Sequence, residues 1–162
     1  MPLVLLQPPV VPREEAGDLG RVLLLEDRAG GIGQRAAPRA ARAGTSIEVR
    51  ERVQGRFDLV LVDAPCSGSG TWRRAPEAKW RLSEERLAEL GRLQREVIES
   101  AARHVAPRGV LAYATCSILD EENDAQITRF REAVPDWTVD RTRHWTPGPE
   151  GDGFYLCVFS RR

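Results

Sequence analysis

The chain has 162 residues, which is the size of one ordinary domain and enough to bury a core. Its 24 Lys and Arg residues balance 24 Asp and Glu residues, so no field of the whole molecule attracts nucleic acid. RNA binding would therefore need a local basic patch.

The three cysteines, Cys66, Cys116 and Cys157, follow neither a dense disulfide framework nor a zinc-binding spacing, which indicates free thiols in a reducing compartment. The apolar run at residues 3–6 is too short for a signal peptide. No stretch approaches the roughly 20 apolar residues of a membrane span. We expect a soluble, cytoplasmic protein without a metal.

In chain order, the first expected strand covers residues 21–26 and ends on Glu26. A helix is expected over residues 32–43, a short strand over residues 47–49, and the clearest strand over residues 57–62. The first nineteen residues fit this scheme poorly. Only residues 3–6 could form a strand there, and the rest carries three prolines and no glycine-rich turn.

The clearest helix follows Ser83, which can cap it, and its apolar stripe runs from Leu87 to Val105. We expect residues 107–109 to end this helix and residues 109–115 to form a second buried strand. A helix over residues 121–134, capped by Asp120, and strands over residues 137–140 and 154–160 follow, with the last strand alternating at an edge of the sheet. This order predicts a mostly parallel α/β sheet with helices on both faces.

Two segments place a cysteine just beyond the carboxyl end of a predicted strand. The run Asp-Ala-Pro-Cys-Ser-Gly-Ser-Gly-Thr at residues 63–71 contains Cys66, and the run Ala-Thr-Cys-Ser at residues 114–117 contains Cys116. Ligands of open α/β sheets bind at this edge, so we expect both cysteines and Asp63 to meet in one crevice. Within the first run, Gly68 and Gly70 allow tight turns that a side chain would obstruct.

These two segments, with residues 73–83 between them, resemble the S-adenosylmethionine-dependent RNA cytosine-C5 methyltransferases, the Sun/NOP2/NSUN group. The resemblance implies a Rossmann-like class I methyltransferase fold, S-adenosylmethionine as cofactor and RNA, foremost rRNA, as substrate. It covers residues 20–162 as a partial catalytic domain and leaves residues 1–19 as an atypical segment, where the family's first strand and glycine-rich loop are missing or replaced. We therefore expect weak cofactor binding and a sheet exposed where the first strand should lie.

The resemblance also implies roles for the site residues. Cytosine C5 is a poor nucleophile until a thiolate adds at C6, and Cys116 matches the family's nucleophile. Cys66 matches the cysteine that helps to release the methylated product. Asp63 is placed to meet the charge at N3 and can also lie near the cofactor.

Other residues receive less specific expectations. Lys79, the only lysine of the chain, matches the family's lysine and could anchor a phosphate, stabilise a carboxylate or lower a thiol pKa. Glu26 is a candidate for the cofactor's ribose hydroxyls, with a surface acid as the alternative. Pro65 would hold the base-facing backbone, while Arg73 and Arg74 would bind phosphates unless their loop is merely solvated.

Structural roles compete with the functional ones. Asp63 could simply cap a turn, and Cys157, between two apolar residues, is expected to be a small buried hydrophobe. His104 and His144 lie in no ligand-like spacing and are expected to be structural.

Two other functions remain open from the sequence. A non-catalytic fragment that binds RNA or a protein partner would explain the missing glycine-rich loop. A cysteine hydrolase that uses residues 66–70 as its nucleophile turn is the weaker alternative, because neither histidine lies where it would act as a base.

Overall fold

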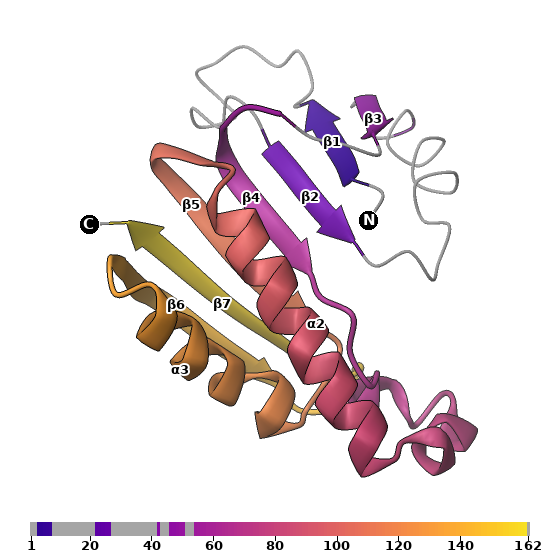
Figure 1. Cartoon of the computed structure of the whole chain (residues 1–162). Coiled ribbons are helices and arrows are strands. Elements are labelled where there is room, and N and C mark those ends of the chain that lie inside the picture. The colour runs from indigo at the N-terminus through magenta and orange to yellow at the C-terminus, as the bar shows by residue number, and fades with distance from the viewer. Residues whose placement is uncertain (1–2, 8–21, 27–41, 43–45, 51–53, 162) are drawn as a thin grey trace.

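The computed structural model describes residues 3–7, 22–26, 42, 46–50 and 54–161 (Figure 1). Seven strands form one sheet in the order β3-β1-β2-β4-β5-β7-β6. Their bounds are β1 Leu3–Gln7, β2 Val22–Glu26, β3 Ser46–Arg50, β4 Phe57–Asp63, β5 Val105–Thr115, β6 Trp137–Trp145 and β7 Phe154–Arg161. Strands β2, β4 and β5 run parallel, whereas β1 and β7 run antiparallel to their neighbours. The Rossmann-like α/β sheet predicted from the sequence is confirmed.

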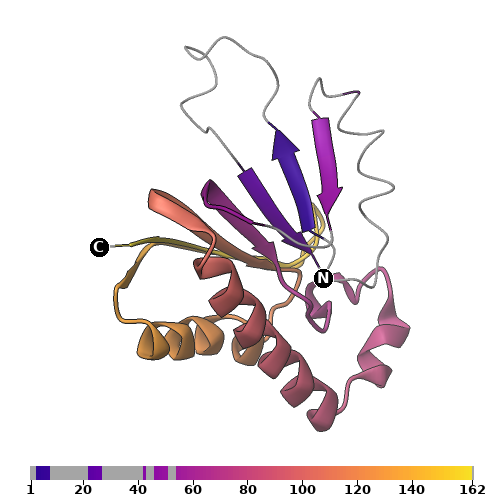
Figure 2. The same cartoon turned by 45° about the horizontal axis from the view of Figure 1, so that its top comes forward.

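Helices α2 (Glu84–Ala102) and α3 (Asp124–Ala133) cover the same face of this sheet, as Figure 2 shows. Ser83 caps α2 as predicted, because its Oγ accepts a hydrogen bond of 3.2 Å from the Arg86 backbone N–H. The connections within residues 54–161 contain the short 3-10 helices η2 Ser69–Thr71, η3 Pro76–Arg81 and η4 Asp120–Glu122. The helix expected over residues 32–43 lies outside the described residues, apart from residue 42.

The core lies between this helical layer and the centre of the sheet. Val97, Ile98 and Ala101 of α2 are buried against β4 and β5. On the α3 side, Phe130 packs edge-on against Phe159, with ring centroids 5.3 Å apart. These contacts fix the two central strands, whose carboxyl ends carry the predicted site.

The arrangement next to β4 corrects one expectation. Strand β2 pairs directly with β4, residue by residue from Val22 opposite Leu59 to Glu26 opposite Asp63. Strand β1 then lies antiparallel between β2 and β3. The sheet is therefore continuous at the position where we expected it to be exposed, because β2 takes the hydrogen-bonding edge of β4.

The start of β5, the continuity of one helix and the place of β7 in the sheet also differ from the sequence prediction. Strand β5 begins at Val105 opposite Phe57, so residues 107–109 form an irregularity inside this strand rather than a helix end, with Arg108 at a φ of 66°. The predicted helix at 121–134 is divided, because Glu122 is buried in η4 and Asn123 leaves the helical conformation before α3 begins. Strand β7 alternates as predicted but lies between β5 and β6, and β6 forms the edge.

Candidate active site

Both predicted cysteine loops leave the same edge of the sheet. Strands β4 and β5 are parallel neighbours with Asp63 opposite Ala114, and the Ala64 backbone N–H donates a 2.8 Å hydrogen bond to the Ala114 carbonyl. Beyond these positions, the Sγ atoms of Cys66 and Cys116 lie 3.4 Å apart, and both residues are half-buried. The predicted meeting of the two cysteines is confirmed.

The short contact shifts the pKa values of the two thiols in opposite directions. The hydrogen bond between them raises the pKa of Cys66, and burial raises it further. The same hydrogen bond lowers the pKa of Cys116, against the opposing effects of burial and of the Asp63 charge. The contact itself allows either sulfur to donate, and the two pKa shifts favour a thiol at Cys66 and a thiolate at Cys116.

Asp63 ends β4 at this edge. The residue as a whole is exposed, yet neighbouring atoms desolvate its carboxyl group, and this raises the pKa of Asp63. Its charge acts on Cys116, because it is one of the causes that raise the pKa of that thiol. Glu26 ends β2 directly opposite Asp63, so the backbone brings both predicted acids to neighbouring strand ends.

A buried carboxylate that the sequence analysis missed joins the two cysteine loops. Glu122 is 0% exposed. Its Oε1 accepts hydrogen bonds from the Ser67 backbone N–H at 2.8 Å and from Gln94 Nε2 at 3.1 Å. Its Oε2 accepts from the hydroxyls of Ser67 at 2.6 Å and Ser117 at 2.5 Å. One side chain therefore holds the residue that follows each cysteine.

The signal for Glu122 was present but ambiguous. It lies in the acidic run at residues 120–122, which the sequence analysis interpreted as a helix start. A run of acids usually faces solvent, and only the serine that follows each cysteine hints at a shared partner. The fold alone shows that Glu122 turns inward.

Close backbone contacts complete the loop packing. The Gly70 N–H donates to the Cys116 carbonyl at 3.0 Å, and the Gly70 carbonyl accepts from the Gly153 N–H at 2.9 Å. A side chain at Gly70 would collide with the Gly153 backbone, and Gly68 adopts a φ of 69°. The predicted need for glycine at both positions is confirmed.

The remaining predicted residues lie along the chain between β4 and α2. Pro65 is buried, and its carbonyl accepts from Gln94 Nε2 at 2.8 Å, so it holds the loop. Arg73 and Lys79 are exposed, with the Lys79 Nζ 5.9 Å from the Trp80 ring centroid. Arg74 forms an ion pair with Asp152, which links this loop to the turn before β7.

The residues expected to be structural have structural contacts. Cys157 is 0% exposed in the core, as predicted. His104 lies 3.2 Å from the Gly55 carbonyl, and His144 lies 3.3 Å from Asp124 Oδ2. Both histidines of the chain thus have partners other than Cys66 and Cys116, which argues against a cysteine hydrolase.

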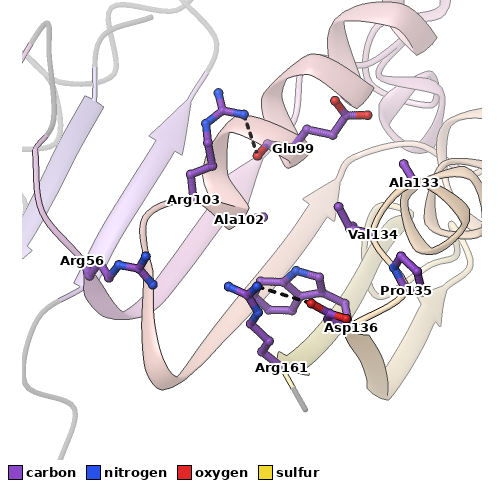
Figure 3. Close-up of a pocket in the computed structure, with 10 residues that line it drawn as sticks. Arg56, Glu99, Ala102, Arg103, Ala133, Val134, Pro135, Asp136 and Arg161 are labelled. Atoms are coloured by element: carbon purple, nitrogen blue, oxygen red, sulfur yellow. Dashed lines mark hydrogen bonds and ion pairs between the residues drawn. The ribbon is translucent and has the colours of Figure 1, made fainter.

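A separate pocket of about 620 Å³ lies at the amino ends of the parallel strands, away from the two cysteines (Figure 3). Arg56, Arg103 and Arg161 line it, and Arg161 Nη2 pairs with Asp136 at 3.4 Å. Arg56 precedes β4, so this pocket lies at the far end of that strand from Cys66. Among the described residues, no helix has the length and apolar character that a membrane crossing requires, and no cluster suited to a metal ion occurs.

Comparison with known proteins agrees with this geometry. Residues 34–156 match the family described as 16S rRNA methyltransferase RsmB/F. Ribosomal RNA small subunit methyltransferase B of Klebsiella pneumoniae is 44% identical over 115 residues, which cover 66% of this chain and 27% of that protein. The protein of the same name from Cronobacter sakazakii is also 44% identical over 115 residues. The chain thus spans about a quarter of the length of these relatives.

Solved structures share the fold of this chain. PH0851 superposes with a TM-score of 0.62 at 38% identity, covering 65% of this chain and 27% of that one. NSun6 from Pyrococcus horikoshii, solved with SFG, superposes with a TM-score of 0.65 over 85% of this chain and 41% of that one, and at 17% identity it shows the fold alone. With the family match extending over three quarters of its length, the chain belongs to the RsmB/F family of 16S rRNA methyltransferases.

Proposed function

We propose that the chain carries the reaction centre of an RNA (cytosine-5) methyltransferase that acts on rRNA with S-adenosylmethionine, through a covalent cysteine adduct at cytosine C6. One observation supports this most: two thiols lie 3.4 Å apart at the carboxyl edge of the sheet, and the pKa of one is raised while that of the other is lowered. Two such sulfurs suit a covalent mechanism in which one forms a carbon–sulfur bond and the other assists its release.

In this proposal, the Cys116 thiolate donates an electron pair to C6 of the cytosine and forms the carbon–sulfur bond. The electrons of the C5–C6 double bond move toward C5 and the N3 side of the ring. Asp63 meets this charge, because desolvation raises its pKa and favours the protonated carboxyl that can donate to N3. The adduct makes C5 nucleophilic.

S-adenosylmethionine, when bound, supplies the methyl group that C5 accepts. The residue that would hold this cofactor is Glu26, since an acid at a strand end suits ribose hydroxyls, and Asp63 at the neighbouring strand end would lie beside the cofactor. The C5 proton then leaves to water, its bond electrons restore the C5–C6 double bond, the C6–S bond electrons return to Cys116, and N3 returns its proton to Asp63. The Cys66 thiol, whose Sγ lies 3.4 Å from the Sγ of Cys116, would donate a hydrogen bond to that departing thiolate.

The test is covalent capture of a short RNA that contains cytosine, analysed on a denaturing gel in the presence of a large excess of S-adenosylmethionine, because we expect this chain to bind the cofactor weakly. We expect Cys66→Ala to accumulate an adduct, and Cys66→Ala combined with Cys116→Ala to form none. The buried Cys157 provides the control, because Cys157→Ala should leave the adduct of the Cys66 variant in place. An adduct that persists without Cys116 would contradict the proposal, and so would normal turnover by Cys66→Ala.

A further inference from the structure

Exposed apolar side chains gather beside Cys116. Within the described ranges, the large hydrophobic side chains that remain exposed are Trp80, Ile118, Trp145 and Phe154. The last three, 40–49% exposed, line one pocket of about 290 Å³. Clustered apolar surface of this kind usually marks a binding site.

The pocket lies at the same edge of the sheet as the two cysteines. Ile118 is two residues beyond Cys116, and the residue between them, Ser117, also lines the pocket. Phe154 begins β7 one position before the Tyr155–Thr115 pair, which places it level with Cys116. Trp145 ends β6 directly opposite Phe154. A ligand in the pocket would therefore be a neighbour of a group that reacts at Cys116.

The lining favours a flat aromatic ligand. Trp145 offers a large ring, and the Arg143 guanidinium lies 5.7 Å from its centroid, which adds a positive charge beside the ring. Unpaired nucleobases stack on such aromatic and guanidinium groups, and the adjoining phosphates are attracted to arginine.

The polar groups of the lining already have partners inside the protein. The Asn123 side chain donates to the Ser117 carbonyl at 2.9 Å and accepts from Thr115 at 2.7 Å. The Ser117 hydroxyl donates to Glu122, and His144 pairs with Asp124. These groups hold the pocket's shape, so recognition depends on stacking more than on hydrogen bonds to a particular base.

We propose that this pocket binds an unpaired nucleobase next to the target cytosine, by stacking on Trp145 and Phe154 with little preference among bases. The inference rests on the proposed function, because it names a feature of the RNA held at that site. It also requires the RNA to be single-stranded on one side of the target.

The experiment measures the affinity of the chain for a short single-stranded RNA by fluorescence anisotropy. Each nucleotide around the central cytosine is replaced in turn by an abasic one. We expect one flanking position at which removal of the base weakens wild-type binding roughly tenfold, or about 1.4 kcal/mol. Trp145→Leu should weaken binding of the intact RNA similarly and make that position insensitive, whereas Trp145→Phe, which keeps a ring, should retain the sensitivity.

Trp80→Leu is the matched control, because Trp80 is 84% exposed and lies outside the pocket. It should leave the position dependence unchanged. In a flat profile, an abasic nucleotide changes the affinity equally little at every flanking position. A flat profile for the wild type, or a Trp145→Leu profile identical to that of the wild type, would overturn the proposed base-binding pocket. Covalent capture at Cys116 with a flat profile overturns the pocket alone, and a Trp145-dependent profile without capture overturns the proposed reaction alone. A chain that binds no RNA overturns both.

Discussion

At the scale of single residues, the site depends on a sulfur pair and on one buried carboxylate. The two thiols differ in pKa because the hydrogen bond between them stabilises negative charge on Cys116 at the expense of Cys66. Glu122 holds the loops that bring these sulfurs together. Each of these contacts leads to a measurable expectation.

The first concerns the pH dependence of thiol reactivity. Because the pKa of Cys116 is lowered, its thiolate forms at lower pH than in an ordinary cysteine, for which the pKa is about 8.5. Alkylation of Cys116 by iodoacetamide should therefore have its midpoint below about pH 8.5. Cys66→Ala removes the donor and should move the midpoint upward, as followed by mass spectrometry of the labelled peptide. An unchanged midpoint would show that the hydrogen bond does not control Cys116.

The second concerns Glu122. Glu122→Gln replaces a carboxylate that accepts four hydrogen bonds with an amide of similar shape, and we expect the free energy of unfolding to fall by about 2 kcal/mol. The variant should also bind phenylarsine oxide, which bridges neighbouring thiols, more weakly than the wild type. Glu121→Gln is the control, since Glu121 is exposed. Equal arsenical binding by both variants would mean that Glu122 does not position the sulfurs.

At the scale of elements, the loops beyond β4 and β5 pack through glycine. A Cβ at Gly70 would meet the backbone of Gly153, which cannot move aside like a side chain, whereas a Cβ at Gly151 meets nothing within 4 Å. Gly70→Ala should therefore cost about 1–3 kcal/mol of stability and slow covalent capture. Gly151→Ala, the same change in a neighbouring turn, should stay within about 0.5 kcal/mol of the wild type in thermal unfolding. Similar losses in both variants would contradict this packing.

The success of the sequence prediction followed the strength of local signals. Apolar runs predicted β4 and β7, and the Ser83 cap predicted the start of α2, since burial and capping depend on nearby residues. The irregularity in β5 and the inward turn of Glu122 were missed, because long-range partners determine both: Phe57 for the strand, and Ser67 and Ser117 for the acid. The sequence prediction that Cys66 and Cys116 lie close together was correct, because neighbouring parallel strands end at the same edge of the sheet.

At the scale of the whole molecule, one prediction concerns the affinity of this chain for S-adenosylmethionine. The sequence of residues 1–19 carries a single glycine, Gly17, and therefore lacks the glycine-rich run that gives dinucleotide and nucleoside sites their close backbone approach. We expect titration calorimetry on the 162-residue chain to detect weak S-adenosylmethionine binding or none. Loss of several hydrogen bonds of about 1 kcal/mol each weakens affinity by orders of magnitude. Micromolar binding would show that the continuous β2–β4 pairing restores a working site.

The closeness of the two sulfurs also makes the protein sensitive to oxidation. Hydrogen peroxide would convert the Cys116 thiolate to a sulfenic acid, and the Cys66 thiol, 3.4 Å away, would then displace water from it to form a disulfide. Intact mass should fall by two hydrogens and return on addition of dithiothreitol, and Cys66→Ala should oxidise further, to the irreversible acids. The disulfide would in this way protect Cys116, the proposed nucleophile, in a reversible form until reducing conditions return.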